Sequence, residues 1–500
     1  MKSVINTILQ HCQKSWFHFS IIILLAFFQL FYKLGYIPIQ KWDEGKNAVS
    51  AYEMLQNKNY LVRYYEGQPD NRGFKPPLLT WHQVILMKLI GVNELAVRIP
   101  SALYALFTVL LIFRFMKYEL KLPPVGIVAA YVLLTSYGYL DRHIARTGDH
   151  DSMIVFFLAV QAVYFYKYLK YKDKRNRYIA IITLALIFGT LTKSVVALSF
   201  IPCFILYAIL ERKLKYVVLH RQLYWYMCSY LLIIFAYYLY RELNAPGYLS
   251  AVWENELLPR YSNNAENYSY GHLKNYFFYI SNLWERRLVP WVYILPFFIL
   301  TLFFVKEETF RKVFRYLLLI CVTYLLIISL GTKNIWYDAP LYPLIAVIMA
   351  MGIYQWMRFI LLFPVRIYFR WGLLILIAAS LIYYPVHSTK GLTFAVREKA
   401  WLYEEQGINY FLRDNLRKEQ NIGTLGVAYP GYHSHIRFYM NLLNDTGSDL
   451  CFVKYKMLTP ASMVIASEAK VKEYIEQNYD CTKVFEKDSA AIYRIKVAWR

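Results

Sequence analysis

The chain is a series of long apolar runs separated mostly by short polar connections. A helix needs roughly 20 mostly apolar residues to cross a bilayer. The apolar run at 178–210 would form one helix about 50 Å long, which exceeds the roughly 30 Å hydrocarbon core, so we divide it at 189–193. The pattern predicts eleven membrane-spanning helices, at residues 16–34, 100–116, 123–140, 152–170, 178–191, 194–210, 222–240, 290–305, 314–330, 338–357 and 367–385.

Positive charges set the predicted orientation of these helices. The first run follows Lys2 and Lys14 and has no small-residue cleavage site after it, which indicates a retained anchor with the N-terminus in the cytoplasm. Alternate connections are then basic, as the positive-inside rule requires. The basic clusters are Lys117/Lys121, Lys167/Lys170/Lys172/Lys174/Arg175/Arg177, Arg212/Lys213/Lys215, Lys306/Arg311/Lys312/Arg315 and Arg358/Arg366/Arg370.

The composition supports a membrane protein and gives the net positive charge a different explanation. Hydrophobic residues make up 58% of the 500 residues, which excludes an ordinary soluble enzyme. A net charge of +23 would suggest a nucleic-acid partner in a soluble protein. Here the cytoplasmic connections account for it, so we expect membrane lipids and no nucleic acid as partners. The expected location is the bacterial inner (plasma) membrane.

Three outer segments are long enough to carry function, namely 35–99, 241–289 and the tail from 386. The sequence therefore predicts a membrane domain at 1–385, with outer loops 35–99 and 241–289, and a small extracytoplasmic (periplasmic) α/β domain at 386–500. Within the tail we expect a helix at 398–417 and strands at 423–428 and 490–497. Cys451 and Cys481 are compatible with either a disulfide or two free thiols.

Acids and bases gather on the predicted outer face. Acidic residues close to hydrocarbon are costly unless they are paired or functional. The start of a helix stabilises a carboxylate. Lysines at helix ends commonly extend their ammonium groups to the membrane surface. Each residue alone therefore has an ordinary explanation. Together they suit a substrate with an anionic phosphate and an apolar tail. The group comprises the acids Asp43, Glu44, Asp149 and Asp151 and the cations Lys75, Lys193, Arg260 and Lys333.

These residues lie in an ordered series of motifs. The series comprises Trp42-Asp43-Glu44-Gly, Ala51-x-Glu53-Met54-Leu, Lys75-Pro-Pro-Leu-Leu-x-Trp81, Gly91-Val-Asn-Glu94-x-Ala-x-Arg98-x-Pro100-Ser101, Ala145-Arg-Thr-Gly-Asp149-His-Asp151, Leu191-Thr-Lys193 and Lys333-x-x-Trp336-Tyr337-x-x-Pro340. In this series the chain resembles membrane glycosyltransferases of the GT-C fold, in the group of protein O-mannosyltransferases and the lipid A aminoarabinose transferase. The resemblance is strong over the first 200 residues, weaker to about Pro343 and absent from the tail.

The resemblance implies inverting transfer of a sugar from a polyprenyl-phosphate donor to a lipid, glycan or protein acceptor at the outer face. Asp43 would be the catalytic base and Asp151 the second essential acid, with Glu44 and Asp149 beside them. Lys75 would hold the donor phosphate. The further phosphate ligands would be Arg260, Tyr337, Lys193 and Lys333, with Arg286 or Arg287 as alternatives to Arg260.

No cofactor is certain from the sequence. Asp43, Asp149, His150 and Asp151 could supply oxygen or nitrogen ligands to a divalent metal ion, but their spacing specifies no metal.

Three other functions compete with sugar transfer. A transporter or flippase for polyprenyl-linked glycans would place charges in mid-helix and often show two related halves, and the sequence has neither feature. A glycan polymerase or ligase would differ in its donor while keeping the same architecture. An anchor for the tail would leave the acid and lysine series unexplained.

Overall fold

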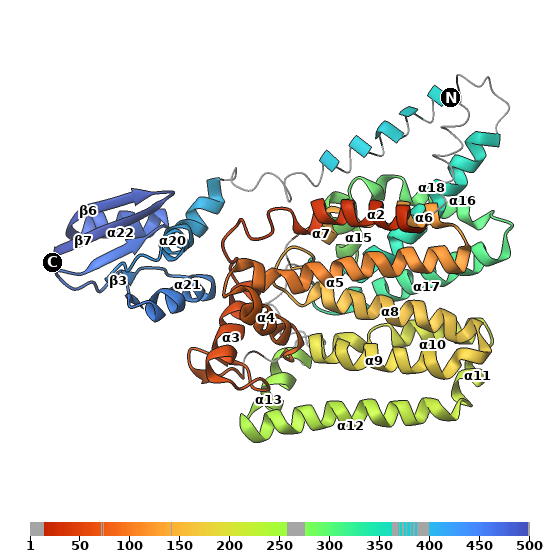
Figure 1. Cartoon of the computed structure of the whole chain (residues 1–500), viewed down its shortest axis with the longest axis horizontal. Helices are drawn as coiled ribbons and strands as arrows, with labels where there is room; N and C mark the ends of the chain where they lie inside the picture. Colours follow the sequence, from red (N-terminus) through yellow and green to blue (C-terminus); the bar gives the residue numbers. More distant parts are fainter. Residues whose placement is uncertain are drawn as a thin grey trace. The chain divides into compact units, whose positions relative to one another are not determined.

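The computed structural model describes residues 15–71, 73, 75–141, 143–257, 276–362 and 400–498, with scattered positions from 369 to 387. The chain forms two compact units (Figure 1). Unit 1 comprises Met1–Tyr32, Pro69–Leu79 and Pro100–Phe394, and unit 2 comprises Lys33–Gln68, Thr80–Ile99 and Ala395–Arg500.

The regular elements of unit 1 are almost all helices among its described residues. Its longer helices are α2 (Ser15–Ala26), α6 (Pro123–Leu134), α8 (Asp151–Lys170), α9 (Arg175–Lys193), α10 (Ile201–Leu210), α12 (Arg221–Asn244), α16 (Leu295–Phe303), α17 (Glu308–Leu330) and α18 (Leu341–Leu362), together with most of α5 (Glu94–Phe115). Short helices connect them, including α7 (Tyr137–Leu140), α11 (Leu214–Val218), α13 (Tyr248–Val252) and α15 (Phe278–Asn282). Short helical segments of other types complete the described unit: the 3-10 helices η3 (Lys172–Lys174), η4 (Ser194–Leu198) and η7 (Trp291–Tyr293), and the π-helices η1 (Phe27–Phe31), η2 (Met116–Leu120), η5 (Trp253–Leu257) and η6 (Leu283–Arg287).

The apolar runs match the helices that the sequence predicts. Among the described residues, six helical stretches are long and apolar enough to cross a membrane: Glu94–Leu120, Asp151–Lys170, Lys172–Leu198, Arg221–Asn244, Glu308–Leu330 and Leu341–Ile360. Trp16–Phe31, Pro123–Leu134 and Ile201–Leu210 are shorter apolar helices within predicted spans, whereas Leu78–Ile90 is an apolar helix in a predicted outer loop. The predicted span 367–385 lies largely outside the described residues.

The run at 178–210 is interrupted where the length argument requires. Helix α9 ends at Lys193, and η4 separates it from α10. Ser194 has a φ of 47°, a conformation that side-chain-bearing residues rarely adopt, and this turns the chain out of the helix. The break therefore leaves Lys193 as the last residue of α9.

Helices α8, α9 and α12 lie side by side (Figure 1). A short connection makes α8 and α9 antiparallel, and α12, which follows α10 and α11, runs in the same direction as α9. The start of α8, the end of α9 and the end of α12 consequently share one end of unit 1. The basic connections at 167–177 and 212–215 lie at the other end. This arrangement places Asp151 and Lys193 together and away from the basic clusters.

Unit 2 contains a mixed sheet with helices packed against it. Its elements are α3 (Asp43–Asn57), β1 (Tyr64–Tyr65), β2 (Gln68–Pro69), α4 (Leu78–Ile90), the start of α5, α20 (Ala400–Arg417), β3 (Thr424–Val427), α21 (Ser434–Asp445), β4 (Asp449–Phe452), β5 (Met463–Ala466), α22 (Ala469–Asn478), β6 (Tyr479–Lys487) and β7 (Ala490–Ala498). The five-stranded sheet has the order β4-β3-β5-β7-β6. Strand β3 is parallel to β4 and β5, and β7 is antiparallel to β5 and β6. The expected helix and both expected strands of the tail are present.

One hydrophobic core joins the tail to the segments at 33–68 and 80–99. Buried Ala48 and Met54 of α3 and Val84 of α4 belong to the same cluster as Ile436 of α21 and Val427 of β3. At Gly45 an added Cβ would lie 2.6 Å from the backbone nitrogen of His435, so this contact between α3 and α21 requires glycine. The helix that begins at Asp43 is therefore held by the tail.

Cys451 and Cys481 are both free thiols. Cys451 lies on β4 and Cys481 on β6, the two opposite edge strands of the sheet. Neighbouring strands are about 4.8 Å apart, whereas a disulfide needs Cα atoms within about 7 Å. The sheet thus excludes the disulfide that the sequence left open.

Candidate active site

A buried ion pair stands at the centre of the candidate site in unit 1. Lys193 Nζ donates a hydrogen bond to Asp151 Oδ1 at 2.6 Å, and the two side chains are only 6% and 7% exposed. Asp151 is the first residue of α8, where the free amides and the helix dipole favour a carboxylate. Both charges are therefore stabilised, and two residues that the sequence places on the same face form an ion pair.

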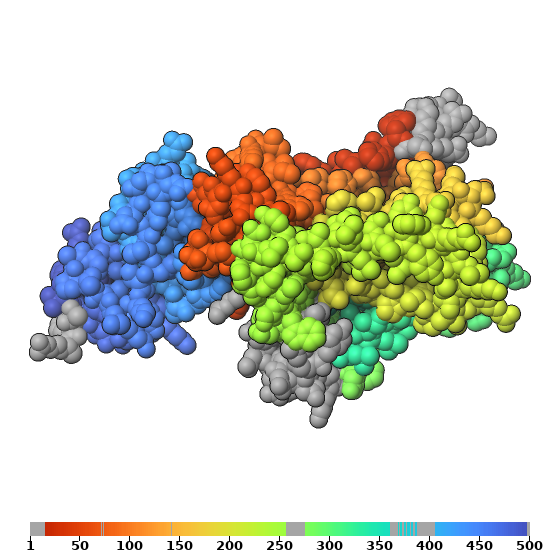
Figure 2. All heavy atoms as spheres, turned by 90° about the horizontal axis from the view of Figure 1, so that it is seen from below, coloured from red at the N-terminus to blue at the C-terminus, as the bar shows by residue number. Residues whose placement is uncertain are grey.

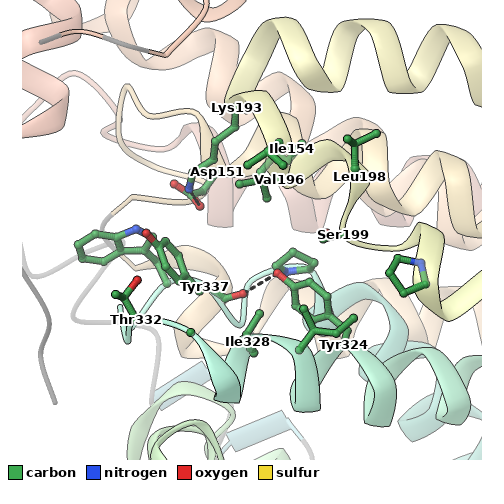
Figure 3. A pocket seen from close by; sticks show the side chains of 16 residues that line it. Asp151, Ile154, Lys193, Val196, Leu198, Ser199, Tyr324, Ile328, Thr332 and Tyr337 are labelled. Atoms are coloured by element: carbon green, nitrogen blue, oxygen red, sulfur yellow. Dashed lines mark hydrogen bonds and ion pairs between the residues drawn. The ribbon is translucent and has the colours of Figure 1, made fainter. Parts of the chain in front are cut away.

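An apolar cavity of about 250 Å³ opens beside this ion pair (Figure 3). Ile154, Val196 and Ile328 line it, and Tyr337 faces the ion pair from the connection between α17 and α18. Lys193 Nζ lies 5.5 Å from the centre of the Tyr337 ring. Tyr324 fixes this connection by donating a hydrogen bond to the Tyr337 carbonyl oxygen at 2.9 Å. The cavity thus combines an apolar wall with a charged end, which suits an amphiphilic ligand.

Asp149 and His143 form a second polar group in unit 1. His143 Nδ1 lies 3.3 Å from Asp149 Oδ2, and the His143 ring stacks on Trp336 with centroids 3.9 Å apart. Imidazole and carboxylate are common ligands of divalent metals, so these two side chains could hold an ion together. His150 is buried at the residue before α8. His143 was not a predicted ligand, because its contact with Trp336 joins segments that are distant in the sequence.

Lys333 hydrogen-bonds the backbone at the end of α17. Its ammonium donates hydrogen bonds to the carbonyl oxygens of Ser329 and Gly331 at 2.5 and 2.6 Å, at the C-terminal end of α17. Burial lowers its pKa. A lysine there satisfies carbonyl groups that the helix leaves without partners. We therefore attribute a capping role to Lys333.

Arg287 also forms hydrogen bonds within the protein. Its Nη1 donates to Asp141 Oδ2 at 2.8 Å and its Nε to the Tyr342 hydroxyl at 3.1 Å. Tyr342 donates in turn to Asp338 Oδ1 at 2.8 Å. Burial raises the pKa of Asp338 to about 6, although Arg287 opposes the shift. This network holds the connection that carries Tyr337, while Arg286 bonds the Tyr137 hydroxyl at 2.8 Å.

In unit 2, Asp43 and Glu44 occupy different environments. Asp43 is the first residue of α3 and is partly exposed. Glu44 is 1% exposed, and Arg98 donates to its two oxygens at 2.6 and 3.0 Å. Arg98 also donates to the carbonyl oxygens of Leu34, Ile37 and Pro38, at 2.7 to 2.9 Å. Through Arg98, Glu44 thus holds the segment that precedes Asp43 in place.

Of two further predicted phosphate ligands, the structure describes Lys75 but not Arg260. Lys75 is partly buried in unit 1, in the Pro-Pro segment just before α4. Arg260 lies outside the described residues.

Comparison with known proteins finds the same resemblance that the motifs carry. The family model described as dolichyl-phosphate-mannose-protein mannosyltransferase matches residues 74–240. An undecaprenyl phosphate-alpha-4-amino-4-deoxy-L-arabinose arabinosyl transferase of Wigglesworthia glossinidia brevipalpis is 32% identical over 197 residues, covering 37% of this chain and 33% of that protein. An uncharacterised protein of Aquifex aeolicus is 27% identical over 175 residues, covering 35% and 34%. The chain thus spans about a third of the length of these relatives.

Solved structures match over nearly the whole chain. The crystal structure of ArnT from Cupriavidus metallidurans bound to undecaprenyl phosphate has a TM-score of 0.68 at 14% identity, covering 95% of this chain and 97% of that one. The oligosaccharyltransferase of Archaeoglobus fulgidus has a TM-score of 0.54 at 12% identity, covering 85% and 64%. Identities this low establish the fold alone. The chain is therefore an integral membrane protein with the GT-C fold and a small C-terminal sheet region, and it is similar to polyprenyl-phosphate-dependent and mannosyl-transferring membrane enzymes.

Proposed function

We propose that this chain is a glycosyltransferase that moves a sugar from a polyprenyl-phosphate donor to a lipid, glycan or protein acceptor at the outer face of the membrane. The observation that carries this proposal is the buried Asp151–Lys193 pair at the end of an apolar cavity. An anionic head joined to an apolar chain matches both parts of the cavity. Turnover of a radiolabelled polyprenyl-phosphate sugar by the purified protein tests the proposal.

Asp43 is the proposed general base. Glycosyl transfer passes through an oxocarbenium-like state, in which the acceptor must lose a proton and the leaving phosphate gains negative charge. Asp43 would take the acceptor proton, because it is partly exposed at a helix start. Attack by an acceptor activated on the face opposite the leaving group predicts inversion at the anomeric carbon.

Glu44 and Arg98 are proposed as positioning residues. Arg98 saturates both oxygens of Glu44, so Glu44 has little capacity left to accept a substrate proton. Their pairing instead fixes the turn from Pro38 to Asp43. We therefore place the catalytic role on Asp43 and the supporting role on Glu44.

Lys75→Ala should raise the donor KM roughly 10-fold or more and leave the acceptor KM nearly unchanged. A compact ammonium is suited to a phosphate oxygen. Losing one charged hydrogen bond typically weakens binding by about this factor. Steady-state kinetics with each substrate varied separately would measure it. Lys88→Ala is the matched control, because Lys88 is exposed on α4 and its ammonium bonds the Tyr60 hydroxyl at 2.9 Å. An effect confined to the acceptor KM would contradict the assignment.

The orientation of the chain is a separate prediction. We expect the N-terminus and the basic connections in the cytoplasm and the C-terminus outside, because positive residues are retained on the cytoplasmic side. An alkaline phosphatase fused after Arg500 should be active, whereas the same reporter fused after Lys213 should be inactive. The reverse pattern would reject this orientation and the outer active site.

A further inference from the structure

Helix α12 is largely exposed, but it carries one buried charged residue. Figure 2 shows α12 lying along one face of the chain, and its buried residues are Tyr237 and Arg241. Arg241 is 0% exposed, whereas Trp225 and Leu232 of the same helix are 76% and 69% exposed. Ionisable residues that turn inward from a spanning helix usually mark a functional site.

The guanidinium of Arg241 has few partners. Among the described residues, no group accepts a hydrogen bond of normal geometry from its Nε, Nη1 or Nη2, although the Tyr248 side chain lies close enough to interact with its charge. Its contact is with the Tyr248 ring, whose centre lies 4.2 Å from the guanidinium carbon. A buried opposite charge, Glu256, acts electrostatically on the same tyrosine. Stacking and the charge of Glu256 offset part of the cost of burial, but among the described residues Nε, Nη1 and Nη2 have no hydrogen-bond acceptor.

Arg241 is connected to the candidate site through aromatic side chains. Tyr248 stacks on Tyr238 with ring centroids 5.9 Å apart, and the Tyr238 hydroxyl lies 2.9 Å from Ser194 Oγ. Ser194 directly follows Lys193, the partner of Asp151. The end of α12 also shares its end of unit 1 with these residues (Figure 1).

We propose that Arg241 is a binding residue for the phosphate group of the polyprenyl-phosphate donor. Guanidinium groups match phosphate oxygens with two parallel hydrogen bonds, which would satisfy the donors that the described protein leaves open. The inference rests on the proposed function for the identity of the ligand. It adds a phosphate contact that the sequence motifs do not contain.

A structural role is the competing explanation. In that case the arginine anchors α13 by stacking on Tyr248, and its cationic head complements the C-terminal dipole of α12. The two explanations predict opposite changes in stability. Removing an anchor should destabilise the protein, whereas removing an incompletely bonded buried charge should leave it as stable or make it more stable.

The experiment compares thermal unfolding of the full chain in nanodiscs with and without undecaprenyl phosphate. We expect Arg241→Met to unfold at the same temperature as the wild type or several degrees higher without the lipid. We also expect it to bind undecaprenyl phosphate roughly 10- to 100-fold more weakly than the wild type does. Arg175→Met is the matched control, because Arg175 stacks on Tyr216 at 3.6 Å but also bonds Tyr168 and the Tyr216 carbonyl. It should lower the unfolding temperature and leave lipid affinity unchanged.

Two further ligands identify what Arg241 recognises. Undecaprenol, which lacks the phosphate, should give no Arg241-dependent stabilisation, and neither should inorganic phosphate at millimolar concentration. Equal protection by inorganic phosphate would overturn the assignment to the lipid donor. Unchanged undecaprenyl-phosphate affinity in a destabilised Arg241→Met protein would establish the structural role. Because this is a binding measurement, Arg241-dependent binding in a protein that transfers no sugar would refute the proposed function and leave this inference standing.

Discussion

Asp43→Asn should lower turnover by about 10²- to 10⁴-fold, the range expected when a general base is lost. The amide has the shape of the carboxylate but cannot accept the acceptor proton. Donor affinity and unfolding temperature should change little, because the carboxylate that secures this segment is the neighbouring Glu44. Single-turnover kinetics at saturating donor and acceptor would separate the chemical step from binding.

Asp480→Asn provides the control for this substitution in the same unit. Asp480 lies on β6 and forms a 3.8 Å ion pair with Lys496, both about half exposed, and pairs of this kind contribute little. Its loss should leave turnover unchanged. Near-normal activity in Asp43→Asn would move the base elsewhere, with Asp151 as the next candidate.

Lys193→Met should destabilise the protein by about 3–5 kcal/mol and abolish transfer. The substitution leaves the Asp151 carboxylate buried without its cation, and breaking one side of a buried pair has this cost. Unfolding in detergent, together with the transfer assay, would measure both effects.

The double variant Asp151→Asn/Lys193→Met separates structure from function. It removes both charges, so stability should recover toward the wild-type value while transfer remains lost. Recovery of transfer together with stability would contradict a role for this pair in handling the donor.

The sequence predicted the elements whose patterns are local. An apolar run bounded by Asp151 at one end, and another bounded by Lys193, predicted both helix ends and their shared face. The length of the run at 178–210 predicted the break that the structure has after Lys193. In the tail, the strands at 424–427 and 490–498 and the helix at 400–417 follow from alternation and periodicity alone.

Contacts between distant segments could not be predicted in this way. Asp43 and Glu44 are adjacent acids in the sequence, and only the contact with Arg98, 54 positions away, shows that Glu44 is bonded. Arg287 was a candidate phosphate ligand until its pairing with Asp141, 146 positions away, became visible. Arg241 was not among the predicted site residues, because its burial and its contact with Tyr248 leave no periodic signal in the sequence.

Transfer from a polyprenyl-phosphate donor can be measured directly. Wild-type protein and Asp43→Asn, each in nanodiscs, would receive a polyprenyl-phosphate sugar labelled in the sugar, with membrane lipid extract as the acceptor source. We predict labelled product and stoichiometric release of polyprenyl phosphate with the wild type, and neither with the variant. Transfer from a nucleotide sugar instead, or equal product formation by wild type and Asp43→Asn, would contradict it.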